Sequence, residues 1–149
     1  MAKSEFTTVD VLITAEPGFE PSYAKAGDAG ADLRSAVDLV VPAGERVLVP
    51  TGVGVALPLG YVGLVHPRSG LAAKSGVTVL NAPGTIDAGY RGEIQVILVN
   101  TSKQDFKIER GDRIAQLLVQ RVEFAKFHRV SELPGTERGD SGFGSSGRN

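Results

Sequence analysis

The feature that most limits how this chain can fold is its series of short runs of Val, Ile and Leu, each ended by Pro or Gly. No uninterrupted stretch of about 12 residues repeats apolar side chains at the spacing of an amphipathic helix. Strands are predicted at Val9–Ile13, Leu39–Val41, Arg46–Val49, Val53–Leu57, Tyr61–Val65, Val77–Leu80, Ile94–Val99, Phe106–Ile108 and Ile114–Phe124. Many short strands separated by turns are typical of a sandwich, jelly roll or barrel. We therefore predict an all-β, jelly-roll-like barrel or sandwich.

One short helix is expected within this β pattern. It spans Ser69–Lys74, with Ser69 as the N-cap and Gly76 just past the end. After Glu132 the strand pattern stops. We predict a folded body over residues 1–132 and a flexible Gly/Ser-rich C-terminal tail over residues 133–149.

Composition narrows the class of protein. With 149 residues and 42% apolar side chains, the chain can bury one core. Its 16 Lys and Arg against 17 Asp and Glu give no general attraction to nucleic acid or to an acidic membrane. Cysteine is absent, which fits a reducing compartment, so we expect a cytoplasmic protein. Two histidines far apart in sequence, His66 and His128, make a zinc site improbable.

Two stretches bear on a membrane or secreted location. The first ten residues, MAKSEFTTVD, contain no apolar run, so we expect no secretory signal. The stretch from Val47 to Pro67 has no charged residue and is long enough to cross a bilayer as a helix. Pro50, Pro58 and four glycines interrupt it, which favours short buried strands instead.

Two segments of the body offer groups for an anion or a cation. Asp32 follows a Gly-rich turn, and its carboxylate can face a hydrated Mg²⁺, although it can equally be a turn former that bonds its own backbone. Arg68, Ser69 and Gly70 begin the predicted helix. They can form an anion seat, or a simple N-cap beside a surface arginine.

A third segment, Asn81 to Glu93, reads as a long hairpin-like loop punctuated by Pro-Gly and Ala-Gly. The carboxamide of Asn81 offers a donor and an acceptor, which suits the edge of a nucleobase. Asp87 is a candidate general base and Tyr90 a flat platform. The alternative is a surface hairpin with one exposed aromatic side chain.

The last twelve residues, RGDSGFGSSGRN, cannot build a core. Arg138, Ser145 and Ser146 are donors suited to phosphate oxygens, and Phe143 offers a ring on which a base can stack. Gly142 to Gly147 matches a dinucleotide fingerprint, but two residues remain after it, so no helix can follow. The segment is therefore either a lid that closes over a ligand or a disordered terminus.

Five segments in order carry a resemblance to a known family. They are A-G-x-D-L, P-R-S-G-L-A, N-x-P-G-T-I-D-A-G-Y-R-G-E, R-G-D-R-I-A-Q-L and R-G-x-x-G-F-G-S-S-G, and they run from about Ala26 to Gly147. Together they resemble the five motifs of trimeric dUTPase. The resemblance implies a jelly roll, a homotrimer with shared active sites, and Mg²⁺-dependent hydrolysis of dUTP to dUMP and pyrophosphate. Such an enzyme keeps uracil out of DNA and supplies dUMP for thymidylate synthesis.

The resemblance also implies roles for individual residues. Asp87 activates the water that attacks the α-phosphorus, and Asp32 holds Mg²⁺ through water on the substrate phosphates. Phosphate contacts are implied for Arg68, Ser69, Gly70 and Gln116; uracil and deoxyribose contacts for Asn81, Thr85, Ile86, Asp87, Tyr90 and Gln95; and a lid for Arg138, Phe143, Gly144, Ser145 and Ser146.

Two other functions stay open at this point. One is a dCTP deaminase of the same superfamily, whose chemistry requires a Glu at the pyrimidine C4. The Asp87 and Tyr90 pattern favours dUTP. The other is a nucleotide sensor without catalysis, against which the complete set of motif residues argues.

Overall fold

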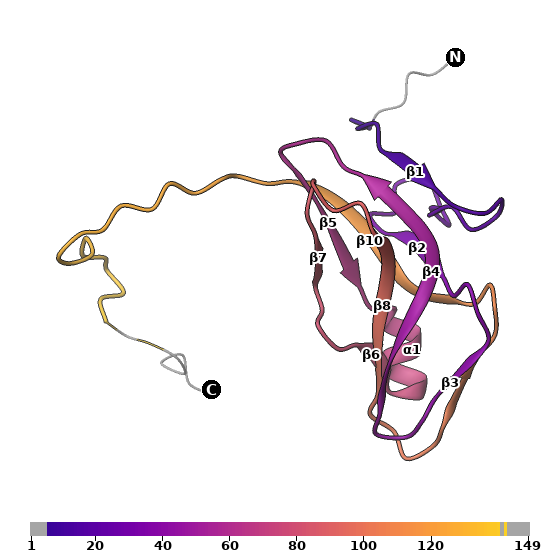
Figure 1. Cartoon of the computed structure of the whole chain (residues 1–149). Helices are drawn as coiled ribbons and strands as arrows, with labels where there is room; N and C mark the ends of the chain where they lie inside the picture. Colours follow the sequence, from indigo (N-terminus) through magenta and orange to yellow (C-terminus); the bar gives the residue numbers. More distant parts are fainter. Residues whose placement is uncertain (1–5, 141, 143–149) are drawn as a thin grey trace.

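In the computed structural model, which describes residues 6–140 and 142, the chain forms ten strands and one helix (Figure 1). The elements are β1 (Leu12–Thr14), β2 (Ala31–Arg34), β3 (Leu39–Val41), β4 (Arg46–Ala56), β5 (Tyr61–His66), α1 (Ser69–Ser75), β6 (Val77–Val79), β7 (Gly84–Ile86), β8 (Glu93–Asn100), β9 (Phe106–Ile108) and β10 (Arg113–Arg121).

The strands form two four-stranded antiparallel sheets and one two-stranded ribbon. The first sheet has the order β1-β4-β8-β6 and the second the order β2-β10-β5-β7, while β3 pairs with β9. Neither four-stranded sheet closes on itself, and strands distant in sequence lie next to each other, such as β2 beside β10. The predicted all-β, jelly-roll-like fold is therefore confirmed.

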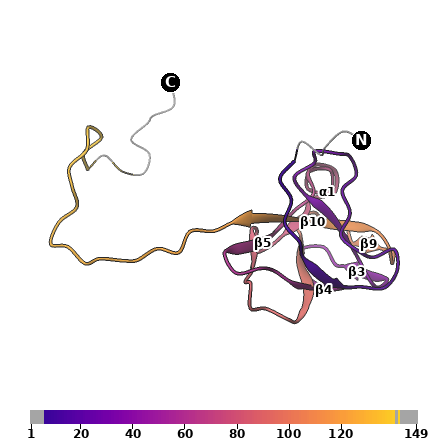
Figure 2. The same cartoon turned by 90° about the horizontal axis from the view of Figure 1, so that it is seen from above.

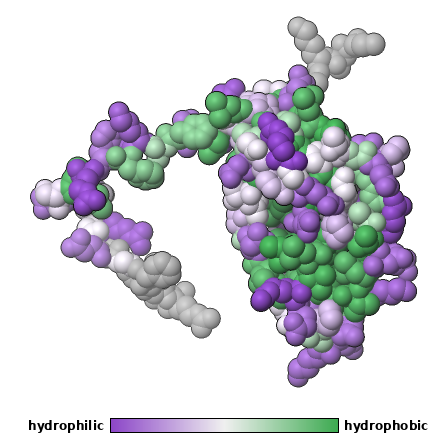
Figure 3. All heavy atoms as spheres, viewed as in Figure 1, coloured by the Kyte–Doolittle hydropathy of each residue, from purple (hydrophilic) through white to green (hydrophobic). Residues whose placement is uncertain are grey.

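Alternation along the long strands places the core between the sheets. In β4, Val49, Val53 and Val55 point inward and are buried, as do Ile94 and Val96 in β8. Burial of such side chains is the main stabilising contribution to a fold of this size. The outward positions of β4 and β8 include Leu48, which is exposed, and Figure 3 shows an apolar area over this face.

Two strands were not predicted from the sequence, β2 and β7. Both are short and lie in Gly-rich stretches, where pattern reasoning predicts turns. Pairing decides otherwise, because β2 bonds to β10 and β7 bonds to β5 along their lengths. The alternative that Asp32 is a turn former is thus wrong, since Asp32 lies within β2 opposite Gln116.

Of the remaining predicted strands, Leu39–Val41 and Phe106–Ile108 are found with the predicted ends, as β3 and β9. The others are found with ends shifted by a few residues, and two of them merge. Arg46–Val49 and Val53–Leu57 belong to one strand, β4, whose register against β8 shifts between Pro50 and Gly54. The extra residues form a bulge, which is how a strand accommodates more residues than its partner.

The predicted N-cap of α1 is wrong by one residue. Arg68 is the N-cap, with extended backbone (φ −96°, ψ 125°) and no capping bond from its side chain. Its carbonyl accepts the first helical bond from the N–H of Ala72, at 3.1 Å. Gly76 ends the helix in the left-handed conformation, as predicted.

The charge-free stretch from Val47 to Pro67 supplies most of β4 and all of β5. In the described part of the chain no helix is long and apolar enough to cross a membrane.

Beyond β10 the chain leaves the body. Residues 122–140, drawn from orange to yellow, run away from the sheets in both views (Figures 1 and 2). Their apolar side chains lie in solvent: Phe124 is 72%, Phe127 94% and Leu133 83% exposed. We call residues 122–140 the arm.

Candidate active site

A cavity of about 480 Å³ opens beside β2, β5 and the start of α1, and we call it the arginine pocket. Asp32 of β2 lies at its wall with its side chain 14% exposed. The carboxylate faces two guanidinium groups, Arg68 Nε at 3.8 Å and Arg113 Nη1 at 3.6 Å. The pocket lining thus contains two arginines and two aspartates, Asp28 and Asp32. Its two guanidinium groups offer the donors that can contact an anionic ligand.

Gln116 of β10 lines the same pocket and is held in place on two sides. Its side-chain amide donates to the carbonyl of Pro67 at 3.0 Å. A Cβ added to Gly30 would lie 2.2 Å from the Oε1 of Gln116, so a larger residue at position 30 would push the Gln116 carboxamide aside. Gly30 therefore lets the Gln116 carboxamide turn into the pocket wall. Ser69 and Gly70 line the pocket beside Arg68.

A second, smaller cavity of about 140 Å³ lies between β7 and β8, and we call it the hairpin pocket. Among its lining residues are the predicted Asn81, Thr85, Ile86, Tyr90 and Gln95. β7 brings its backbone to the pocket by pairing with β5, so the hairpin-like loop is anchored to the second sheet.

Asp87 and Tyr90 are joined by a tight turn at the end of this hairpin. The N–H of Tyr90 donates to the carbonyl of Asp87 at 3.0 Å. The Asp87 side chain is exposed, and its carboxylate has no hydrogen bond or ion pair to any described residue. Arg91 donates to the carbonyls of Ala88 at 2.6 Å and Tyr90 at 3.1 Å, which closes the turn.

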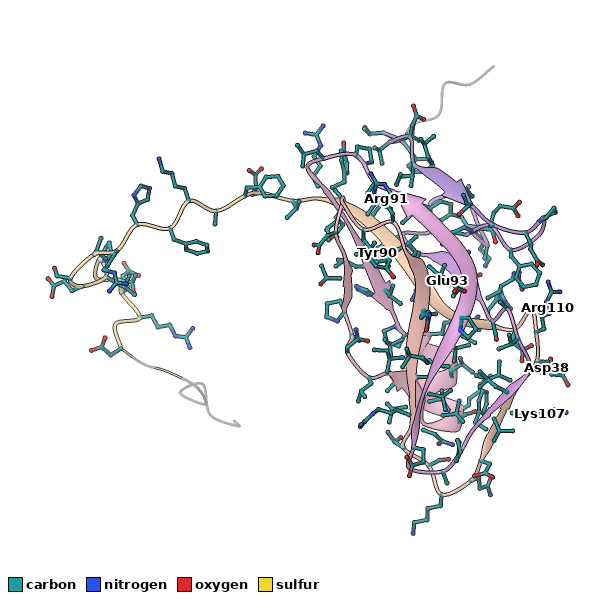
Figure 4. All side chains as sticks on the ribbon, in the orientation of Figure 1. Asp38, Tyr90, Arg91, Glu93, Lys107 and Arg110 are labelled. Atoms are coloured by element: carbon teal, nitrogen blue, oxygen red, sulfur yellow. The ribbon has the colours of Figure 1, made fainter. Side chains whose placement is uncertain are left out.

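The Tyr90 ring, 46% exposed, is fixed at its far end. Its hydroxyl donates to the carbonyl of Glu93 at 2.7 Å. Figure 4 shows both residues on the side of the body where β4 and β8 lie.

The predicted site residues thus fall into separate groups. The arginine pocket takes Asp32, Arg68, Ser69, Gly70 and Gln116, and the hairpin pocket takes Asn81, Thr85, Ile86, Tyr90 and Gln95. Asp87 lines neither cavity. Arg138 lies on the arm, and Phe143, Gly144, Ser145 and Ser146 lie outside the described residues.

Sequence reasoning missed several residues of these pockets. Gly30, His66 and Arg113 line the arginine pocket, and Glu93 lines the hairpin pocket. The Nε2 of His66 is buried and has no partner among the described residues. Gly30, Arg113 and Glu93 could have been found from the sequence, because they lie within the five segments that resemble the dUTPase motifs. For His66, a place on β5 opposite Gln116 becomes visible in the strand pairing.

Within residues 6–140 and 142, no group of three or more His, Cys, Asp or Glu side chains could by itself hold a metal ion. The arginine pocket nevertheless contains the Asp32 carboxylate beside the guanidinium groups of Arg68 and Arg113, which can bind phosphate. Mg²⁺ commonly binds through one or two carboxylates together with waters and substrate phosphates. The residues present therefore fit a Mg²⁺ ion that arrives with a polyphosphate.

The fold and these two pockets define an all-β, jelly-roll-like protein with one polar cavity lined by arginines and aspartates and a second, smaller cavity. A family model described as dUTPase matches residues 18–147. The chain belongs to the dUTPase family.

Individual proteins of this family resemble the chain closely. It is 63% identical over 148 residues to the deoxyuridine 5'-triphosphate nucleotidohydrolase of Bifidobacterium longum (strain DJO10A), covering 97% of this chain and 94% of that protein. The protein of the same name from Streptomyces coelicolor is 61% identical over 128 residues, covering 85% of this chain and 70% of that protein.

Solved structures agree with the fold. A Staphylococcus bacteriophage 80alpha dUTPase with dUPNHPP has a TM-score of 0.86 and 29% identity, over 95% of this chain and 100% of that one. A mutant dUTPase from phage phi11 of S. aureus, described as coordinating a structural Mg(II) ion, has a TM-score of 0.76 and 25% identity, over 84% and 99%.

Proposed function

We propose that the chain hydrolyses dUTP to dUMP and pyrophosphate, by attack of water on the α-phosphorus. As a member of the dUTPase family it is an enzyme of the dUTP diphosphatase class. The observation that carries the detailed proposal is the pair of pockets, one with two arginines and the other built by a hairpin next to Asp87. In a cytoplasmic setting, this reaction would keep uracil out of DNA and supply dUMP for thymidylate synthesis.

Asp87 acts as the general base. Its carboxylate is exposed and has no partner among the described residues, so its oxygens are accessible to a water molecule from which they can take a proton. The turn that joins it to Tyr90 fixes its backbone, so the carboxylate is presented from a defined place. General-base assistance of this kind is worth about 10²–10⁴ in rate.

The triphosphate occupies the arginine pocket. Arg68, Ser69, Gly70 and Gln116 are the contacts we assign to it, with Arg113 as a further cation. Bound Mg²⁺, held by the substrate phosphates and by Asp32 through water, would neutralise part of the phosphate charge. Positioning and charge stabilisation of this kind provide most of the catalysis in phosphoryl transfer.

The nucleoside occupies the hairpin pocket. Asn81 and the backbone of Thr85, Ile86 and Asp87 read uracil, with the backbone of Gln95 beside them. A narrow pocket has no space for the C5-methyl of thymine. Cytosine reverses donor and acceptor and would leave buried groups unpaired. Tyr90 packs against the deoxyribose and excludes a 2′-hydroxyl.

The working enzyme is a homotrimer whose sites are shared between subunits. Two features support this: the predicted site residues are divided between separate pockets of one chain, and the arm leaves Phe124, Phe127 and Leu133 in solvent. Exposed apolar surface of this extent commonly marks a protein interface. Arg138, Phe143, Gly144, Ser145 and Ser146 form a lid that reaches a neighbouring subunit's site. Light scattering should give three times the chain mass of 15.6 kDa.

One assay separates the candidate functions. The protein is incubated with Mg²⁺ and either dUTP or dCTP in ¹⁸O-labelled water, while pyrophosphate and ammonia are measured. We expect pyrophosphate from dUTP and the label in dUMP. Ammonia from dCTP would instead indicate a deaminase, and binding of dUTP without turnover would indicate a sensor. Label in pyrophosphate would contradict attack on the α-phosphorus.

A further inference from the structure

We infer that Glu93 is a positioning residue that sets sugar selectivity by holding Tyr90 in place from β4. This rests on the proposed function, in which Tyr90 packs against the deoxyribose. It adds a residue to which the proposed function assigns no role, and it links the selectivity of the hairpin pocket to a bulge in the neighbouring strand, β4.

The first link joins the Tyr90 ring to β8. The Tyr90 hydroxyl donates to the backbone carbonyl of Glu93 at 2.7 Å. The ring lies so close to Gly92 that a Cβ there would be 2.6 Å from the hydroxyl and 2.7 Å from Cζ. The position of the ring therefore depends on where the backbone of residues 92 and 93 lies.

The second link joins Glu93 to β4. The N–H of Gly52 donates to the Oε1 of Glu93 at 2.7 Å. Gly52 lies in the bulge where the register of β4 against β8 shifts, and its φ of +69° suits glycine. The Gly52 N–H therefore bonds to a carboxylate instead of to a backbone carbonyl of β8. Hydrogen bonds to carboxylates are stronger than those between two amides.

The bulge is held to β8 by a buried side chain, Thr51. Thr51 is fully buried, its hydroxyl donates to the carbonyl of Ile94 at 2.6 Å, and it accepts from the N–H of Val53 at 3.2 Å. The carboxylate of Glu93 is thus tied to a fixed part of the core. Arg91 closes the turn through the carbonyls of Ala88 and Tyr90, but neither bond touches the Tyr90 hydroxyl. In Figure 4 the Glu93 label lies at β4, to the right of Tyr90.

The test compares kcat/KM for dUTP with kcat/KM for UTP. Glu93→Ala should lower the dUTP/UTP ratio about fivefold, the scale of one lost hydrogen bond, mainly through a lower KM for UTP. Glu93→Gln keeps an oxygen that can accept from Gly52, so it should retain most of the ratio. Tyr90→Phe should also lower the ratio. Adding Glu93→Ala to Tyr90→Phe should change it by less than about twofold, since both act through one ring.

Glu109→Ala is the matched control, because Glu109 is an exposed glutamate whose side chain pairs with Lys107 on β9. It should leave the ratio unchanged. An unchanged ratio in a folded Glu93→Ala variant would overturn the inference. So would an equal loss in Glu93→Gln, or effects of Glu93→Ala and Tyr90→Phe that simply multiply.

A second measurement does not depend on turnover. Hydrogen exchange of the Gly52 amide should accelerate in Glu93→Ala and stay slow in Glu93→Gln. Absence of dUTP hydrolysis by the unaltered protein would count against the proposed function. Equal Gly52 exchange in Glu93→Ala and the unaltered protein would count against the tie between Glu93 and β4.

Discussion

At the scale of residues, the aspartates of this chain differ in what their carboxylates do. Asp38, Asp105 and Asp112 each accept a hydrogen bond from a backbone N–H, so they hold loops. Asp32 faces two arginines. Between Asn81 and Glu93, Asp87 is the one acidic residue. Its carboxylate accepts no hydrogen bond from a described residue, so it does not hold a loop. This difference is the physical basis for assigning it the base.

The substitution Asp87→Asn tests that assignment. The amide keeps the size of the side chain but cannot take a proton from water. We expect kcat for dUTP to fall by about 10²-fold or more. Binding of a non-hydrolysable dUTP analogue, measured by calorimetry, should stay within a few fold. Turnover close to that of the unaltered protein would remove Asp87 from the base role.

Replacing Tyr90 by Ala tests whether this side chain excludes the 2′-hydroxyl of a ribonucleotide. Without the ring, a 2′-hydroxyl should find space, so the dUTP/UTP ratio of kcat/KM should fall by about tenfold or more, the scale of a lost steric contact in a pocket. The kcat/KM for dUTP should also fall, because sugar packing is lost. If the ratio is unchanged, sugar discrimination lies elsewhere in the site.

At the scale of elements, the end of β8 is organised by one buried side chain, Asn100. Its Nδ2 donates to the carbonyls of Val41 at 3.0 Å and Gln104 at 2.7 Å, and its Oδ1 accepts from the N–H and hydroxyl of Ser102. It thereby ties β8 to β3 and shapes the turn that leads to β9. The sequence predicted both β8 and β9, but it contained no sign of this connection, because Val41 lies 59 residues before Asn100 in the chain.

The substitution Asn100→Ala should therefore destabilise the fold. It removes a hydrogen-bond partner from the carbonyls of Val41 and Gln104 and from the N–H of Ser102, although the Gln104 carbonyl keeps the Ser102 hydroxyl as a donor. A buried group left unpaired costs about 1–3 kcal/mol. We expect the free energy of unfolding in urea to fall by about 3 kcal/mol. Ser102→Ala is the milder comparison, because the Asn100 side chain keeps its two carbonyl partners. If Asn100→Ala lowered the free energy of unfolding by less than Ser102→Ala does, the role given to Asn100 would be contradicted.

At the scale of the whole molecule, the proposed function requires the C-terminal residues of one chain to complete the active site of another. Deleting residues after Glu137 removes Arg138 and the predicted lid without touching β1 to β10. We expect the truncated protein to keep its mass in solution and its urea midpoint, with kcat/KM for dUTP severely reduced. Full activity would mean that the C-terminal residues are a dispensable terminus.

Mixing variants tests whether sites are shared. Trimers reassembled from truncated chains and Asp87→Asn chains should regain activity that neither parent has. In such trimers some sites combine an intact Asp87 from one chain with an intact C-terminus from another. Activity no higher than the sum of the two parents would contradict a lid that works between subunits.

The sequence by itself determined the fold class, because alternating apolar runs and Gly/Pro turns allow little else than antiparallel sheets. It also gave the residue types of the candidate site, since chemistry needs those groups wherever they lie. Tertiary structure alone decided that Asp32 lies in a strand, that Arg113 joins Arg68 around it, and that Glu93 is tied to Gly52. Each of these depends on pairing between segments far apart in the chain. A local pattern cannot encode such pairing, because it results from the packing of the two sheets on one core.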